Sequence, residues 1–509
     1  MQKQFKNLLK GILIYGFGNV SVKLVGFVLL QLYTNPKILS VEEFATSLIL
    51  ESTSLVIVSI FSLALYTAYI RWYWDKEFIN QRKSILFSCY ALLLGIGALL
   101  SLSGYFCSKT FSLILFGKDS FSIPIILMII GISIQFLIDL TLSQMRVEEK
   151  PTFYITTNLI RLTVSLLATV YFLKYANHGL VGIYEALLLG NLAFMIITIP
   201  YILKRIEFKF NFPVLKEMLK FSSPIAFASI SGILLSQFDR YVLNFSSTLI
   251  NVSVYSLGVK IANITKLFII NSIQIALTPT YFKLMNHPDH KAIYSRIMTW
   301  FTILVVYTTL FLSLFGLEIT KLFSISAIYW DAYKIIPILS LGIIFSMLKD
   351  TSIIGLQITK RTKIIGLTLA GIAPFNLLLN LILIPFLGIY GAAITSLVSQ
   401  LFFFIIIHRY AQKHYHIPYR LDRVFSIIII GTILFIAGYL FNCFSLEIRI
   451  IAKFISLLLF PFFLFIFKVF DKKEIIAIKS FIDSIRNIFI NTPPKEVDEQ
   501  VANIEETLN

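Results

Sequence analysis

Long apolar stretches, separated by short polar segments, follow one another along almost the whole chain. Most stretches hold about 20 residues, the length that an α-helix needs to cross the hydrocarbon core of a bilayer. They are too long for the strands of a membrane barrel, which take about 10 residues. The pattern predicts an all-α integral membrane protein of about fourteen spans. We expect these spans at 11–33, 44–66, 84–106, 121–143, 153–173, 180–203, 221–245, 252–280, 297–320, 333–355, 364–385, 390–407, 424–441 and 450–470.

Composition supports an integral membrane protein and excludes a soluble one. Hydrophobic residues make up 57% of the 509 residues and charged residues only 14%, and the mean hydropathy is +0.83. Soluble domains carry about 25% charged residues. The three cysteines lie in or beside apolar stretches without any CxxC or metal-ligand spacing, so we expect neither a disulfide framework nor a metal site.

Basic residues alternate along the loops. If the spans above are correct, the loops on one side carry 24 Lys and Arg and those on the other side carry 6. Cytoplasmic loops are enriched in Lys and Arg, so we expect both termini in the cytoplasm. This bias also accounts for the net charge of +17, and we therefore expect no nucleic-acid partner.

The last 39 residues, 471–509, differ from the rest. Isoleucine and phenylalanine recur at helical spacing over 475–489 with lysines between them, which predicts an amphipathic helix on the inner leaflet. The segment after Pro494 is acidic and has no apolar periodicity, which is typical of a disordered tail.

Two pairs of segments indicate an internal duplication. FSLALYTAYIR at 61–71 resembles IQIALTPTYFK at 273–283, and VGIYEA at 181–186 resembles LGIYGA at 387–392. Spans 1–6 and 7–12 then form two six-helix bundles with the same orientation, related by a pseudo-two-fold axis along the membrane normal. We expect an N-terminal bundle at 11–203, a C-terminal bundle at 221–410 and two further helices at 423–470; chance similarity between apolar helices is the alternative.

Charged side chains inside the predicted spans are the candidate functional residues. Each costs roughly 2.5–3.5 kcal/mol at a helix centre, so they should face the bundle interior or a water-filled cavity. Transporter sites usually lie between the two halves, near the midplane. The candidates for substrate binding are basic: Lys23, Lys260, Lys266, Arg161 and Arg240. The candidates for coupling to a proton or sodium gradient are acidic: Glu51, Asp139 and Asp239.

A structural role is the alternative for each candidate. The lysines would then pair with Glu51 or Asp239 and serve packing. Lys260 and Lys266 are six residues apart and point about 120° away from each other on an ideal helix. They border one cavity only if it surrounds the helix or the helix bends.

Motifs for catalysis are missing. The chain has no Walker A, GxSxG or HExxH motif, so we expect no catalytic residues, no enzymatic activity and no cofactor.

Three stretches resemble the polysaccharide-lipid flippases of the multidrug/oligosaccharidyl-lipid/polysaccharide exporter superfamily. They are 221–264, which contains Pro224, Asp239-Arg240 and Tyr255; DAYKIIPILSLG at 331–342; and NLLLNLILIPFLGIYGAAITSLVSQ at 376–400. The stretch LYTNPKILSVEEFA at 32–45 fits less well, since Ala45 stands where Gly is expected. The resemblance implies a multi-pass protein of the bacterial inner membrane that moves undecaprenyl-diphosphate-linked O-antigen or similar repeat units to the outer leaflet.

The resemblance also implies the partners and the rivals. A lipid-linked oligosaccharide, membrane lipids and other polysaccharide assembly proteins are the expected partners. A peptidoglycan-precursor flippase would share the fold and the cationic cavity. A cation-coupled drug exporter would have a cavity with acids and few unpaired bases. A glycan polymerase would need a large outer loop, whereas the longest predicted outer loop has about 14 residues.

Overall fold

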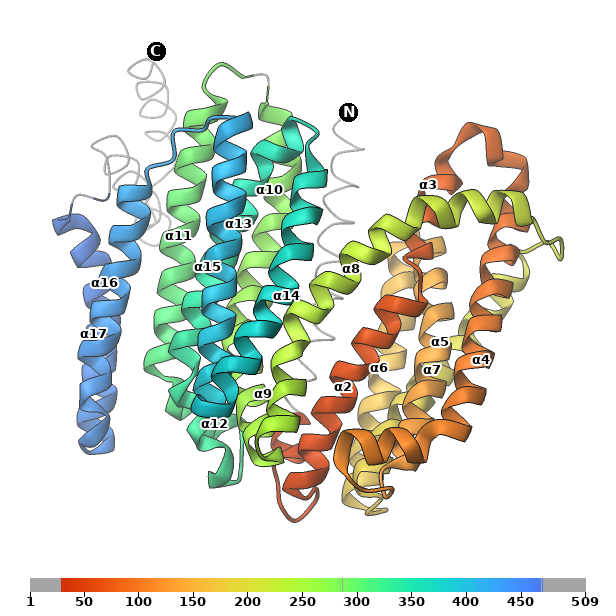
Figure 1. Cartoon of the computed structure of the whole chain (residues 1–509), viewed down its shortest axis with the longest axis horizontal. Helices are drawn as coiled ribbons and strands as arrows, with labels where there is room; N and C mark the ends of the chain where they lie inside the picture. Colours follow the sequence, from red (N-terminus) through yellow and green to blue (C-terminus); the bar gives the residue numbers. More distant parts are fainter. Residues whose placement is uncertain (1–28, 286, 468, 470–509) are drawn as a thin grey trace, which may run out of the picture.

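The computed structural model describes residues 29–285, 287–467 and 469 (Figure 1). Within these residues every regular element is a helix, and thirteen helices are long and apolar enough to cross a membrane. They correspond to thirteen of the fourteen predicted spans, which confirms the predicted all-α membrane fold. Most of the first predicted span, with Lys23, lies outside the described residues, as do the predicted amphipathic helix and the tail.

The N-terminal half forms one bundle (Figure 1). Its helices are α2 (Val41–Phe61), α3 (Leu65–Trp74), α4 (Arg82–Phe116), α5 (Ser122–Val147), α6 (Pro151–Lys174) and α7 (Gly179–Leu203). Most of the second bundle lies on the other side of α8. Its helices are α8 (Phe212–Ser246), α9 (Leu249–Ile264), α10 (Asn271–Leu284), α11 (His290–Leu314), α12 (Gly316–Phe323), α13 (Ile336–Ile358), α14 (Thr362–Leu387) and α15 (Ile389–His414). The last helices, α16 (Leu421–Leu440) and α17 (Leu446–Ile466), pack beside α11.

Several helices are longer than predicted. α4 continues to Phe116, because the apolar run 111–116 extends it until Gly117 ends it with a φ of 69°. α8 begins at Phe212, where the side chain of Asn211 caps the backbone N–H of Val214. The predicted loops at 107–120 and 204–220 are therefore partly helical.

The second spanning helix of each half is interrupted. α2 and α3 are separated by a break in which Leu63 and Ala64 have φ values of 51° and 48°, which non-glycine residues rarely adopt. α9 and α10 are joined by a π-helical turn at Thr265–Ile270. Such strained and π-helical segments concentrate at functional sites. Both interruptions lie in or next to the segments 61–71 and 273–283, whose sequences resemble each other.

Neighbouring helices repeat between the halves. α5 packs against α4 and α7, and α7 packs against α6. The corresponding helices in the second half behave in the same way: α13 packs against α11 and α15, and α15 against α14. This arrangement agrees with the predicted duplication.

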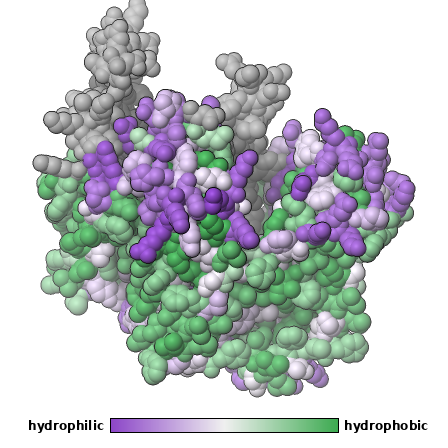
Figure 2. Space-filling model, turned by 45° about the horizontal axis from the view of Figure 1, so that its top comes forward, coloured by the Kyte–Doolittle hydropathy of each residue, from purple (hydrophilic) through white to green (hydrophobic). Residues whose placement is uncertain are grey.

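The two bundles meet at one end and diverge at the other (Figure 1). At the closed end, the backbone N–H of Ile325 donates to Oγ1 of Thr34 at 3.2 Å, and the rings of Phe44 and Tyr329 lie 5.4 Å apart. The opposite end carries the loops rich in Lys and Arg, and Figure 2 shows hydrophilic side chains gathered there above an apolar belt. α8 contacts α3 and α4 of the N-terminal bundle as well as α14 of its own half.

Candidate substrate site between the bundles

An ion pair joins the two halves. Nζ of Lys260, on α9, lies 2.9 Å from Oε2 of Glu51, on α2. The side chains of Lys260 and Glu51 are 29% and 55% exposed. The pair is therefore open to a solute. The sequence left open that Lys260 pairs with Glu51 or with Asp239. In the structure its partner is Glu51, and Asp239 has different neighbours.

Arg240 lies next to this pair. From α8 its Nη1 donates to Oγ of Ser52 on α2 at 3.2 Å, and its Nε donates to Oγ of Ser256 on α9 at 3.1 Å. It also bonds Gln237. Two predicted binding residues, Lys260 and Arg240, thus contact adjacent residues of α2. Within the described residues the guanidinium of Arg240 bonds only the neutral acceptors Ser52, Ser256 and Gln237, and it forms no ion pair.

Asp239 is buried beside Arg240. Its Oδ2 accepts from the hydroxyl of Tyr255, and its Oδ1 accepts from the backbone N–H of Arg240 at 3.1 Å. Ser396 on α15 lies at the limit of hydrogen-bond distance, 3.5 Å. On α14 and α15, the buried oxygens Oδ1 of Asn380 and Oγ1 of Thr395 have no hydrogen-bond partner among the described residues. Such orphaned polar atoms are rare in native structures.

Asp139 and Arg161 belong to a second network, inside the N-terminal bundle. Arg161 donates to Oε1 of Gln135 at 2.5 Å, and Gln135 donates to Oδ1 of Asp139 at 2.7 Å. Asp139 also lines a cavity of about 600 Å³ between α2, α3, α5 and α8. The two candidates are therefore linked through an amide, and they do not contact Lys260 or Arg240.

Lys266 lies in the π-helical turn and is half-buried. The turn begins one residue before it, at Thr265, so the ideal-helix angle between Lys260 and Lys266 does not apply. Lys23 lies outside the described residues.

Several charged residues of the helices escaped the sequence analysis. Arg146 lines the cavity of Asp139, because α5 continues through the predicted loop as far as Val147. Lys349 and Asp350 fall in the predicted span 333–355 and form an ion pair of 2.8 Å. Both residues are charged and lie inside a predicted span, so the criterion used for the other candidates would have included them.

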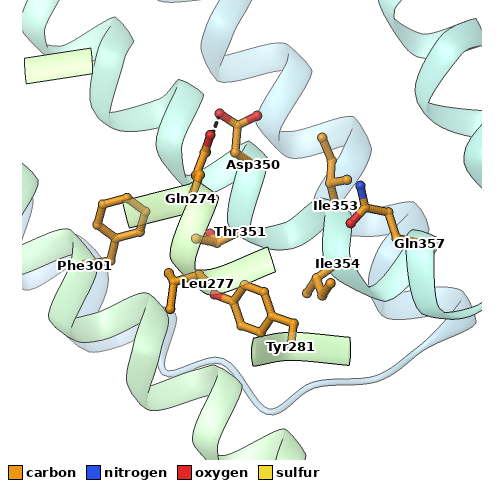
Figure 3. Close-up of a pocket in the computed structure, with 9 residues that line it drawn as sticks. All are labelled: Gln274, Leu277, Tyr281, Phe301, Asp350, Thr351, Ile353, Ile354 and Gln357. Carbon is orange, nitrogen blue, oxygen red and sulfur yellow. Dashed lines mark hydrogen bonds between the residues drawn. The ribbon is translucent and has the colours of Figure 1, made fainter. Parts of the chain in front are cut away.

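Asp350 lines a polar pocket of about 170 Å³ between α10, α11 and α13 (Figure 3). Its Oδ2 accepts from Nε2 of Gln274 at 2.9 Å. Figure 3 shows these two side chains at one end of the pocket and the ring of Tyr281 at the other. The remaining lining residues are Leu277, Phe301, Thr351, Ile353, Ile354 and Gln357.

An apolar groove of about 790 Å³ adjoins this pocket. It runs between α10, α11 and α17, and it shares Leu277 and Phe301 with the polar pocket. Apart from Arg296, its other lining residues are mainly hydrophobic: Ile273, Ile293, Ile297, Trp300, Ile303, Leu304, Tyr307, Phe460, Pro461 and Leu464. A polar recess and an apolar recess thus meet at two shared side chains.

No protein-family model matches the chain, and no curated protein does. Solved structures do match. A lipid II flippase MurJ in an inward closed conformation aligns with a TM-score of 0.73 at 16% identity, over 88% of this chain and 98% of that chain. An inward-facing multidrug resistance MATE family transporter of the MOP superfamily aligns with a TM-score of 0.64 at 13% identity, over 80% and 96%.

A MOP superfamily transporter from Pyrococcus furiosus, described as having a binding pocket of reverse polarity, aligns with a TM-score of 0.56 at 14% identity. That alignment covers 79% of this chain and 95% of that chain. Identities this low establish the architecture alone. The chain has the fold that these flippases and transporters of the MOP superfamily share.

Proposed function

We propose that this protein is a flippase of the multidrug/oligosaccharidyl-lipid/polysaccharide exporter (MOP) superfamily. It moves undecaprenyl-diphosphate-linked oligosaccharide repeat units across the bacterial inner membrane. The observation that carries this proposal is the polar pocket that adjoins an apolar groove. A lipid-linked sugar is an amphiphile, and it needs a polar and an apolar recess side by side.

The charges between the bundles favour an anionic headgroup. Lys260 and Arg240 contact Glu51 and Ser52, which are adjacent on α2, and Arg240 has no ion pair among the described residues. Charge-assisted hydrogen bonds from such cations suit a diphosphate. A lipophilic cation, the usual cargo of a drug exporter, would be repelled. Arg161 adds a further cation inside the N-terminal bundle.

The arrangement of the two halves supports transport by alternating access. The bundles diverge at the end that carries the basic loops, which the positive-inside rule assigns to the cytoplasm (Figure 1). In our proposal the two bundles rock about their shared interface and expose the site to each side in turn, while α16 and α17 move with the second bundle. Other polysaccharide assembly proteins would deliver and accept the substrate.

A peptidoglycan-precursor flippase is the second candidate. The TM-score of 0.73 with a lipid II flippase supports it, and its substrate would also need a cationic site and an apolar groove. The two candidates differ in the group that the diphosphate carries.

Transport against a gradient needs a coupling group. Asp239 is our first choice among Glu51, Asp139 and Asp239, because it is buried beside Arg240 and lies 3.5 Å from Oγ of Ser396 on α15. An Asp239→Asn variant should still bind substrate but lose the response of transport to an imposed proton or sodium gradient. A gradient response equal to that of the unsubstituted protein would exclude Asp239 from coupling.

Flipping by the purified full chain in proteoliposomes tests the function. The probes are an undecaprenyl-diphosphate oligosaccharide, lipid II and the cationic dye ethidium. We expect transport of one or both lipids and none of the dye. Transport of ethidium alone would overturn the proposal, and a preference for lipid II over the oligosaccharide lipid would favour the second candidate.

A further inference from the structure

The polar pocket between α10, α11 and α13 contains hydrogen-bonding groups that the protein itself does not use. Among the described residues, neither the hydroxyl of Tyr281 nor the side-chain amide of Gln357 makes a hydrogen bond. Both residues line the pocket and their hydrogen-bonding groups are not fully buried, so these groups can bond a ligand. Asp350 is only 23% exposed on its side chain and lies at the same pocket.

We infer that this pocket binds one sugar residue of the lipid-linked substrate. The inference rests on the proposed function and assigns the glycan to a particular recess. A sugar carries neighbouring hydroxyls that both donate and accept. They would donate to the Asp350 carboxylate, whose oxygens have lone pairs beyond those used by Lys349 and Gln274. They would bond Tyr281 and Gln357 in either direction.

The rings of the pocket suit the other surface of a sugar. Tyr281 and Phe301 line the pocket together with Leu277 and Ile354. These side chains offer apolar surface to the C–H face of a pyranose. Figure 3 shows Phe301 and Tyr281 on different sides of the recess, so a ring between Asp350 and Tyr281 meets polar and apolar surface at once.

Charged ligands fit less well. A cation would find a single carboxylate that already has Lys349 at 2.8 Å. No group of three His, Cys, Asp or Glu residues that could hold a metal occurs in the described part of the chain. An anion would be repelled by Asp350. A neutral polyhydroxyl group is the ligand class that remains.

A comparable cavity in the other half indicates that the pocket is a repeated feature of the fold. Asp139 on α5 and Asp350 on α13 are 211 residues apart, and Ser62 and Gln274, which line the same two cavities, are 212 apart. The segments 61–71 and 273–283 match at an offset of 212. In each half the cavity thus lies between the interrupted second spanning helix and the aspartate of the fourth spanning helix, which is Asp139 in the first half and Asp350 in the second. The first cavity combines Asp139 with Arg146, whereas the second combines Asp350 with amides and a phenol.

Binding to the full chain in lipid nanodiscs tests the inference. The two probes are undecaprenyl diphosphate and undecaprenyl diphosphate that carries one N-acetylhexosamine. We expect tighter binding of the glycosylated probe. Tyr281→Phe and Gln357→Leu should each reduce this preference by roughly three- to tenfold, the loss of one hydrogen bond, and leave the affinity for the bare lipid within about twofold.

Controls distinguish a loss of sugar binding from a loss of folding. Tyr281→Phe removes only the hydroxyl, because the backbone carbonyl of Tyr281 still accepts from the hydroxyl of Tyr294. Tyr171→Phe makes the same change on the exposed surface of α6 and should alter neither affinity. The melting temperature of each variant verifies folding.

The outcomes distinguish this inference from the proposed function. If neither lipid binds the unsubstituted protein, the proposed function fails. If both lipids bind and the variants keep the preference for the glycosylated probe, the sugar site is overturned and the function stands. An equal loss of affinity for both lipids would also overturn it, since the pocket would then hold the diphosphate or the lipid chain.

Discussion

Nζ of Lys260 lies 2.9 Å from Oε2 of Glu51, and this contact joins α9 of the C-terminal half to α2 of the N-terminal half. Partly exposed ion pairs contribute little to stability, typically below about 1 kcal/mol. The pair is therefore better placed to act in transport than to hold the bundles together. In the proposed function, a substrate diphosphate would compete with Glu51 for Lys260, so substrate binding and separation of the two bundles would be linked.

Replacement of Lys260 tests this link. We expect Lys260→Ala to leave the amount of protein in the membrane near normal and to abolish flipping. A charge-assisted contact to phosphate is worth about 1.5–3 kcal/mol, so the affinity for the substrate should fall roughly ten- to hundredfold. Lys260→Arg keeps the cation with another geometry and should be partly active.

The double variant Lys260→Ala with Glu51→Gln separates binding from charge balance. If Lys260 serves only to neutralise Glu51, removal of both charges should restore flipping. In the binding role the double variant stays inactive. Surface glycan and membrane abundance, measured together in the single and double variants, decide between the two roles.

The spans and the intramembrane charges could be predicted because they are local properties of the sequence, and the duplication because two pairs of segments match. The sequence left the partner of Lys260 open, since Glu51 is 209 residues away. Only the packing of α2 against α9 and α8 brings Glu51 and Ser52 to Lys260 and Arg240. The groove between α11 and α17 was equally invisible, because its two walls look like ordinary membrane-facing helix surfaces in the sequence.

The closed end of the interface can be locked by a disulfide. Thr34 and Ile325 lie close enough for the backbone N–H of Ile325 to bond Oγ1 of Thr34 at 3.2 Å. After replacement of the native cysteines, Thr34→Cys with Ile325→Cys should cross-link on oxidation and stop transport, and reduction should restore it. Continued flipping by the oxidised protein would contradict rocking of the bundles.

A cross-link inside one bundle is the control for this experiment. Oγ atoms of Ser101 on α4 and Ser133 on α5 lie 3.1 Å apart. Ser101→Cys with Ser133→Cys should oxidise as well, because two Oγ atoms at this distance place their Cβ atoms near disulfide geometry. Rigid-body movement of the bundles predicts normal transport in this variant.

Glu148 ties together the loops at the basic end. Burial raises the pKa of its carboxyl, but hydrogen bonds from Arg205, Lys150, Gln144 and Tyr201 prevail and lower the pKa from 4.5 to about 2. A depressed pKa in the folded state stabilises the protein above the unfolded pKa. This stabilisation, at most about 3 kcal/mol, is lost as the pH falls from about 4.5 to 2.

The pH dependence distinguishes this cluster from ordinary surface charge. Glu148→Gln should lower the melting temperature at pH 7, and its difference from the unsubstituted protein should shrink as the pH falls below about 4. Glu149→Gln changes the exposed neighbouring residue and should have little effect at any pH. A difference for Glu148→Gln that does not vary with pH would show that its charge is not responsible.

A buried lysine attaches the last helix to the second bundle. Nζ of Lys453, on α17, is 3.0 Å from both carboxylate oxygens of Glu318 on α12, and the Lys453 side chain has no exposed surface. Arg449 lies 2.9 Å from the same carboxylate. Removing one member of a buried pair leaves an uncompensated charge and costs about 3–5 kcal/mol.

The two single substitutions should differ. Glu318→Gln leaves both Lys453 and Arg449 without their counter-ion and should be the more damaging, with strongly reduced membrane abundance and melting temperature. Lys453→Met should be milder, because Arg449 still balances Glu318. Lys118→Met, which breaks the exposed pair with Glu42, should be neutral within about 1 kcal/mol. If Lys453→Met proved as damaging as Glu318→Gln, packing of the Lys453 side chain rather than its charge would hold α17 in place.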